Sequence, residues 1–194
     1  MSTESTLPAP AVLGEDTAQL LRGTSRLLVT GVAVLTAAHE DLAHGATVST
    51  ASVLSQNPLR LGVSLRRGSL MTQVVERSGR FAVNVLSSRQ ALLADWFANP
   101  RRPSGAAQFG LVRTRTDEDT GIPLLREALA CFLCELTERV PLGTGDDLLV
   151  AEIREASAGT GRPLINFGGD LHDVEFHRVR RRQGWRTETT TTLE

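Results

Sequence analysis

The feature that most constrains the fold is a succession of short apolar segments, rich in β-branched residues and separated by polar turns. Such segments are typical of strands. They cover residues 31–38, 43–54, 59–65, 80–86, 111–116, 129–140 and 147–156, and a last one is expected near 174–179. Six or more strands with long-range returns favour a closed antiparallel barrel over a doubly wound parallel sheet.

Helical signals are few and local. A weak apolar period covers residues 16–28. Ser69 is placed to cap a short helix that ends at Gly79, where a left-handed residue is favourable. Ser87 and Gln90 have the spacing of a capping box in front of a second helix at 91–97. The sequence therefore predicts a mainly β protein with short helices inserted between the strands.

Length and charge exclude several classes of protein. The chain has 194 residues, which fits one domain, and its formal net charge of -1 argues against a dedicated nucleic-acid binder. It contains no lysine, which excludes Schiff-base chemistry and the phosphate-binding lysine of nucleotide hydrolases. No Gly-x-Gly-x-x-Gly motif joins a strand to a helix, so we expect any nucleotide to be bound without a Rossmann fold.

The chain divides into one domain and two tails. Residues 1–16 lack periodicity and are expected to form a mobile tail, residues 17–179 form the domain, and residues 180–194 form an arginine- and threonine-rich tail. The uncharged stretch 27–38 is too short to cross a membrane, and the first residues do not resemble a signal peptide. We therefore expect a cytoplasmic protein that binds neither membranes nor nucleic acid.

Two cysteines, Cys131 and Cys134, have the spacing of a metal or redox motif. They lie in an apolar segment that is expected to be a strand, where residues three apart point to opposite faces. No second cysteine pair or histidine pair completes a zinc site. The sequence thus predicts buried thiols and no metal site.

Hydroxyl side chains concentrate in one region, and an arginine-rich loop follows one strand later. Thr47 and Ser49 are expected to share one face of their strand, with Val48 on the other. The loop 66–69 combines guanidinium groups, a hydroxyl and the free N–H groups of a helix start, which together suit a phosphate. A serine-rich edge strand with a solvated turn is the alternative interpretation.

These segments resemble, in their order along the chain, the flavin reductase family of FMN-binding split barrels. The match includes His-Gly-Ala-Thr-Val-Ser-Thr-Ala-Ser at 44–52 and Phe-Ala-Val-Asn-Val at 81–85. The remaining matching stretches are 30–36, 53–58, 61–69, 78–80, 86, 123–125, 130–134 and 163–165. The resemblance covers about three quarters of the chain and implies an antiparallel split β-barrel that forms a homodimer.

The resemblance also implies a site for FMN or FAD at or near the dimer interface. Residues beside the isoalloxazine ring and ribityl chain would be Ala46, Thr47, Val48, Ser49, Ala51 and Ser52. Ser64, Arg66 and Ser69 would hold the phosphate, and Asn84 would reach the flavin from another strand. In such a site hydrogen bonds tune the reduced ring, whose own chemistry moves the hydride.

One motif departs from the family pattern. Many relatives have Gly-Asp-His before the penultimate strand, with the histidine near the nicotinamide, whereas this chain has Gly145, Asp146 and Asp147. A carboxylate at the nicotinamide-side position cannot donate a hydrogen bond at neutral pH. We assign Asp147 to this catalytic position by the resemblance alone.

The resemblance leads to one main hypothesis and two alternatives. The main hypothesis is an NAD(P)H:flavin oxidoreductase that uses NADH or NADPH and supplies reduced flavin to a partner monooxygenase. The first alternative is a split barrel that binds flavin without nicotinamide-dependent activity. The second is a non-catalytic dimeric binding module whose arginine tail binds a partner or nucleic acid.

Overall fold

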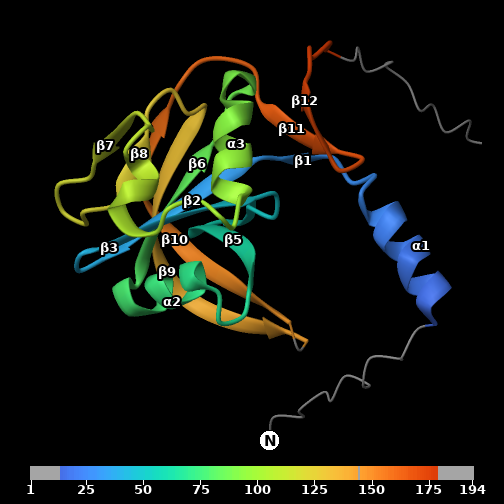
Figure 1. Cartoon of the computed structure of the whole chain (residues 1–194), viewed down its shortest axis with the longest axis horizontal. Helices are drawn as coiled ribbons and strands as arrows, with labels where there is room; N and C mark the ends of the chain where they lie inside the picture. The colour runs from blue at the N-terminus through green and yellow to red at the C-terminus, as the bar shows by residue number, and fades with distance from the viewer. Residues whose placement is uncertain (1–13, 144, 179–194) are drawn as a thin grey trace, which may run out of the picture.

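The computed structural model describes residues 14–143 and 145–178, and its centre is an antiparallel sheet of seven strands (Figure 1). The order across the sheet is β3-β2-β6-β9-β10-β5-β4. The strands of this sheet are β2 (Ala33–His39), β3 (Leu42–Val48), β4 (Ser52–Gln56), β5 (Leu59–Arg66), β6 (Arg80–Val85), β9 (Ala130–Leu142) and β10 (Asp146–Ala158). The predicted mainly β, antiparallel fold class is confirmed.

Short elements surround this sheet. The helices are α1 (Glu15–Ser25), α2 (Leu70–Ser78) and α3 (Ala91–Ala98), with 3-10 turns η1 (Ser88–Gln90) and η2 (Gly105–Phe109). The small sheets are β1 (Thr30–Gly31), β11 (Leu164–Phe167) and β12 (Asp170–Asp173), and the pair β7 (Thr114–Thr116) and β8 (Pro123–Leu125). Among the described residues, no helix is both long and apolar enough to cross a bilayer.

The sheet curls until its two edges nearly meet. Strands β3 and β4 are at opposite edges, yet residues 49–51 alone connect them. Four Cα-to-Cα steps span at most about 15 Å. The connection, which we call the seam, therefore requires the sheet to close into a split barrel. At the seam, the Thr50 hydroxyl donates to the Ser64 carbonyl (3.0 Å) and accepts from the Ser64 N–H (3.2 Å).

Strand β2 explains the long apolar run in the sequence, because it is buried on both faces. Ala33, Leu35 and Ala37 face the barrel interior, where they pack with Phe81, Val63 and Leu149. Val34, on the opposite face, packs beneath α3 with Phe97 and the neighbouring Leu86. A strand covered on both sides has no polar face to alternate with its apolar one.

Helix α2 closes one end of the barrel with the buried side chains of Met71, Val74 and Val75. The Ser69 side chain accepts from the Thr72 N–H, and Gly79 ends the helix in the left-handed conformation with φ 68°. Both predicted end signals of this helix are thus confirmed. The predicted capping box of Ser87 and Gln90 is also present, where it initiates η1 directly before α3.

The structure corrects several predicted strands. The segment 43–54 is divided between β3 and β4, which lie at opposite sheet edges, instead of forming one hairpin partner. The strand expected at 174–179 is absent from 174–178, and Val179 lies outside the described residues. Strands β8, β11 and β12 were not predicted. The helix α1 begins at Glu15, inside the expected tail 1–16, whereas residues 1–13 and the tail 180–194 lie outside the described residues.

The two cysteines lie in different apolar clusters, as their spacing on a strand predicts. Cys134 packs in the barrel interior, and Cys131 packs on the outer face with Ile122 and Leu124. Burial raises the pKa of the Cys131 thiol to about 11 and that of Cys134 to about 12. Both thiols are free, and the described residues contain no group of ligands that could hold a metal ion.

Candidate functional site

The seam brings together most of the residues that the sequence assigns to flavin binding. Ala46, Thr47 and Val48 end β3, Ser49 and Ala51 lie in the seam, and Ser52 begins β4. Strand β5 lies next to β4, with Ser52 opposite Gly62, and so places Ser64 and Arg66 beside the seam. Residues from two sheet edges and an adjacent strand therefore form one surface.

The side chains along β3 alternate as predicted. Val48 is buried in the barrel interior, whereas the Thr47 hydroxyl points to the outside and donates to the Ala94 carbonyl of α3 (2.7 Å). This bond fixes the Thr47 side chain and leaves its oxygen able to accept a further hydrogen bond. Ser52 is exposed, and Ser49 and Ala51 are half-buried, so the seam is accessible from outside.

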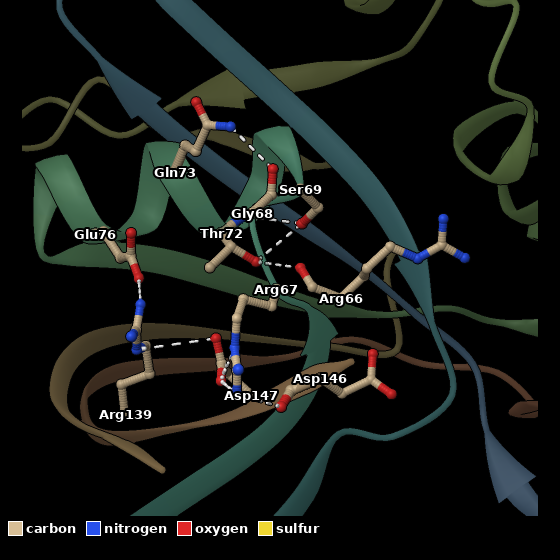
Figure 2. Close-up of polar contacts among 10 residues, drawn as sticks. All are labelled: Arg66, Arg67, Gly68, Ser69, Thr72, Gln73, Glu76, Arg139, Asp146 and Asp147. Carbon is tan, nitrogen blue, oxygen red and sulfur yellow. Dashed lines mark hydrogen bonds and ion pairs between the residues drawn. The ribbon is translucent and has the colours of Figure 1, made fainter. Parts of the chain in front are cut away.

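The arginine turn, residues 66–69, lies at the end of β5 and leads into α2 (Figure 2). The carbonyl of Arg66 accepts from Thr72 Oγ1 (2.9 Å), and the carbonyl of Gly68 accepts from Gln73 Nε2 (2.9 Å). Gly68 has φ 69°, a conformation that glycine adopts without strain. Two carbonyls of the turn, which would otherwise repel an anion, are thereby occupied internally.

The donors of the arginine turn suit a phosphate. The first N–H groups of a helix have no helical acceptor, and the helix dipole adds partial positive charge at that end. The Arg66 side chain is exposed and points away from Arg67 and Asp147 (Figure 2). The Arg66 guanidinium and the first N–H groups of α2 make a donor set that fits the phosphate of a flavin nucleotide. The Ser69 hydroxyl caps the helix instead, since it donates to Thr72 Oγ1 (2.9 Å) and accepts from the Thr72 N–H (3.2 Å).

Asp147, expected on the nicotinamide side, has a fully buried carboxylate. Its Oδ1 accepts from Arg67 Nε (2.9 Å) and from Arg67 Nη2 (2.7 Å), and Arg139 Nε is 3.9 Å from its Oδ2 (Figure 2). The hydrogen bonds from Arg67 hold the pKa of Asp147 below its ordinary value, so the group is ionised at neutral pH. The sequence analysis did not identify Arg67 as the partner of Asp147. The two residues meet because β10 pairs with β5, with Asp147 opposite Leu65, and this pairing leaves no local signal in the sequence.

Asn84 does not join this group, because its side chain is fully buried. Its amide nitrogen donates to the Val34 carbonyl and to Thr36 Oγ1, both at 3.0 Å. Its oxygen accepts from the Leu125 N–H at 2.8 Å. Both amide hydrogens are thus used inside the protein, and the structure gives Asn84 the role of linking β2, β6 and β8 in place of the expected flavin contact.

The fold and the site define a split-barrel flavin reductase. The chain belongs to the family described as Flavin reductase like domain, whose sequence model matches residues 25–175.

Named relatives agree with this assignment. The chain is 53% identical over 192 residues to the NADPH-flavin oxidoreductase of Streptomyces viridifaciens, which covers 96% of this chain and 99% of the relative. It is 35% identical to the reductase component of a 4-nitrophenol 4-monooxygenase/4-nitrocatechol 2-monooxygenase of Rhodococcus opacus, over 81% of this chain and 80% of the relative. The crystal structure of BorF, the flavin reductase component of a bacterial two-component tryptophan halogenase, is similar with a TM-score of 0.76 and 27% identity. That match covers 82% of this chain and 99% of BorF.

Proposed function

We propose that this chain is an NAD(P)H-dependent flavin reductase, which transfers a hydride from NADH or NADPH to FMN or FAD. The observation that carries the proposal is the arginine turn beside the accessible seam, where an exposed Arg66 guanidinium adjoins the first turn of α2. Relatives that match most of the chain are named as flavin reductases that use NADPH or NADH.

The residues have distinct roles in this proposal. Arg66 and the first turn of α2, which Ser69 caps, bind the flavin phosphate, and Ser64 lies beside them on β5. The flavin ring accepts the hydride, so that the protein mainly binds and orients it. The seam surface that orients the ring and the ribityl chain consists of Ala46, Thr47, Val48, Ser49, Ala51 and Ser52.

The reduced flavin is proposed to serve a separate monooxygenase. The relatives include named reductase components of monooxygenases, and BorF is the flavin reductase component of a two-component halogenase. A seam that is open on its outer side is compatible with release of the flavin to such a partner.

The chain is also proposed to act as a homodimer. Helix α1 buries none of its residues within the chain and lies apart from the barrel (Figure 1). Leu28 and Val29, which follow α1, and Val53 and Leu54 of β4 beside the seam are exposed. A second copy of the chain that covers these apolar groups would also enclose the flavin site, since β4 borders the seam.

The test is anaerobic mixing of the flavin-loaded protein with NADH and, separately, with NADPH. Loss of the oxidised-flavin absorbance with at least one donor is expected. A protein that binds flavin but is reduced by neither donor would overturn the reductase proposal and favour a flavin-binding protein with another role. Adding the candidate monooxygenase and its substrate then tests transfer of the reduced flavin.

A further inference from the structure

Two consecutive arginines at the end of β5 have different surroundings. Arg67 lies against the β9–β10 hairpin, where its Nη2 donates to the Gly143 carbonyl (3.1 Å) in addition to Asp147. Arg66 turns outward and points away from this pair (Figure 2). Both side chains keep exposed surface, and they differ in that Arg67 is held by an ion pair. Because the two are chemically identical, the surroundings of the turn must determine which of them is held.

Asp147 determines which arginine is held, because its buried charge requires a partner. Its carboxylate has no exposed surface, and its Oδ2 makes no hydrogen bond among the described residues. A buried carboxylate left without a counter-charge is strongly destabilising. Arg67 supplies that counter-charge through two hydrogen bonds to Oδ1, whereas the Arg139 Nε at 3.9 Å is too distant to replace them.

The same contacts fix the arginine turn on the β9–β10 hairpin. The Arg67 N–H donates to the Gly145 carbonyl (3.0 Å), and the Arg67 side chain holds Asp147 at the start of β10. On α2, Glu76 forms an ion pair with Arg139 of β9. The turn and the helix that it starts are therefore attached to one hairpin at two points.

We infer that Asp147 is a positioning residue for flavin phosphate binding: by holding Arg67 against the β9–β10 hairpin, it fixes the arginine turn and leaves Arg66 and the first turn of α2 directed at the phosphate. The inference rests on the proposed function. It gives Asp147 a role that differs from the nicotinamide-side contact expected from the sequence, because a carboxylate without exposed atoms cannot touch a nucleotide.

The test compares the binding of FMN and of riboflavin, which lacks the phosphate, by quenching of flavin fluorescence. The variant Asp147→Asn keeps the shape of the side chain and removes its charge. Its Kd for FMN is expected to rise about tenfold, because the hydrogen bonds from Arg67 lose the carboxylate charge that strengthens them. Its Kd for riboflavin should stay within about twofold of the wild-type value. Asp146→Asn is the matched control, since the Asp146 carboxylate is exposed and lies opposite Arg66, so that its removal should not raise the Kd for FMN or for riboflavin.

A second variant keeps the test valid if Asp147→Asn fails to fold. Arg67→Gln should weaken FMN binding by a similar factor, and the double variant should be no worse than either single one, because both act through the same pair. Equal weakening of FMN and riboflavin would overturn the inference in favour of general damage to the barrel. An unchanged Kd for FMN with a raised KM for NADH or NADPH would also overturn it, in favour of a nicotinamide contact. A wild-type protein that binds neither flavin would instead overturn the proposed function.

Discussion

At the scale of single residues, the role of a side chain could be predicted from the sequence only where its partners are close in the sequence. The caps at Ser69 and Gly79 were predictable, because a helix end is specified by residues close in sequence. The role of Asn84 was not predictable, since its hydrogen-bond partners lie in β2 and at Leu125, the last residue of β8. The same holds for Asp147, whose partner Arg67 is distant in sequence.

His44 gives a prediction for pH dependence. Burial, and next the charge of Arg102, lower the pKa of His44 to about 4. The unfolded chain has an ordinary histidine pKa of about 6.5, so it binds a proton first as the pH falls. The stabilisation from neutral His44 is therefore complete above about pH 6.5 and is lost as the pH falls toward 4.

The measurement is urea unfolding of wild type and His44→Gln at pH 7 and pH 5. Between these values the wild type should lose about 1–2 kcal/mol more of its unfolding free energy than the variant, allowing for partial exposure of the ring. His177→Gln, at an exposed position, is the control and should follow the wild type. Parallel pH profiles for wild type and His44→Gln would contradict the assignment of this pH dependence to His44.

At the scale of elements, strands were recognisable but their partners were not. Alternation and β-branched residues identify an extended segment, whereas the sheet edge at which it lies depends on contacts distant in sequence. For this reason the segment 43–54 was predicted as one strand, although it forms β3 and β4 at opposite edges of the sheet. The short strands β11 and β12 have too few residues for a periodic signal, and the apolar residues at 174–178 have no partner strand among the described residues.

Two glycines in the sheet allow a matched test of how α3 packs on β3. A Cβ at Gly45 would lie 2.5 Å from the Phe97 ring, and one at Gly62 would lie 2.5 Å from Leu54 Cδ1. Phe97 is buried and packs against Phe109 at 5.4 Å between ring centroids, so that it cannot move away. Leu54 is 50% exposed and can rotate toward solvent.

Gly45→Ala is therefore expected to lower the unfolding free energy by about 1–3 kcal/mol, the usual effect of overpacking. Gly62→Ala, with the same added methyl group, should cost less than about 1 kcal/mol. Chemical denaturation of both variants under the same conditions measures the difference. Equal losses would show that α3 and β3 adjust to the added group as freely as the exposed Leu54 does.

At the scale of the whole molecule, the single chain leaves apolar side chains of α1 and of the segment after it uncovered. Leu20 and Leu21 of α1 are 68% and 52% exposed, and Leu28 is 70% exposed. Single exposed leucines are common, but a helix with no buried residue gains no stability from packing within the chain. The proposed dimer would bury this helix against a second copy of the chain and would make folding and association depend on one another.

We therefore expect light scattering to give twice the mass of one chain, and the melting temperature to rise with protein concentration. The double variant Leu21→Glu and Leu28→Glu places charges on the uncovered surface and should shift the mass toward that of one chain. Leu111→Glu, at a leucine that is 93% exposed in the loop before β7, is the matched control and should leave the dimer intact. If the chain enclosed its flavin at this interface, the monomeric variant would also bind FMN more weakly than the control. A wild-type protein that is monomeric at every concentration, with flavin bound, would show that one barrel holds its cofactor without a second copy.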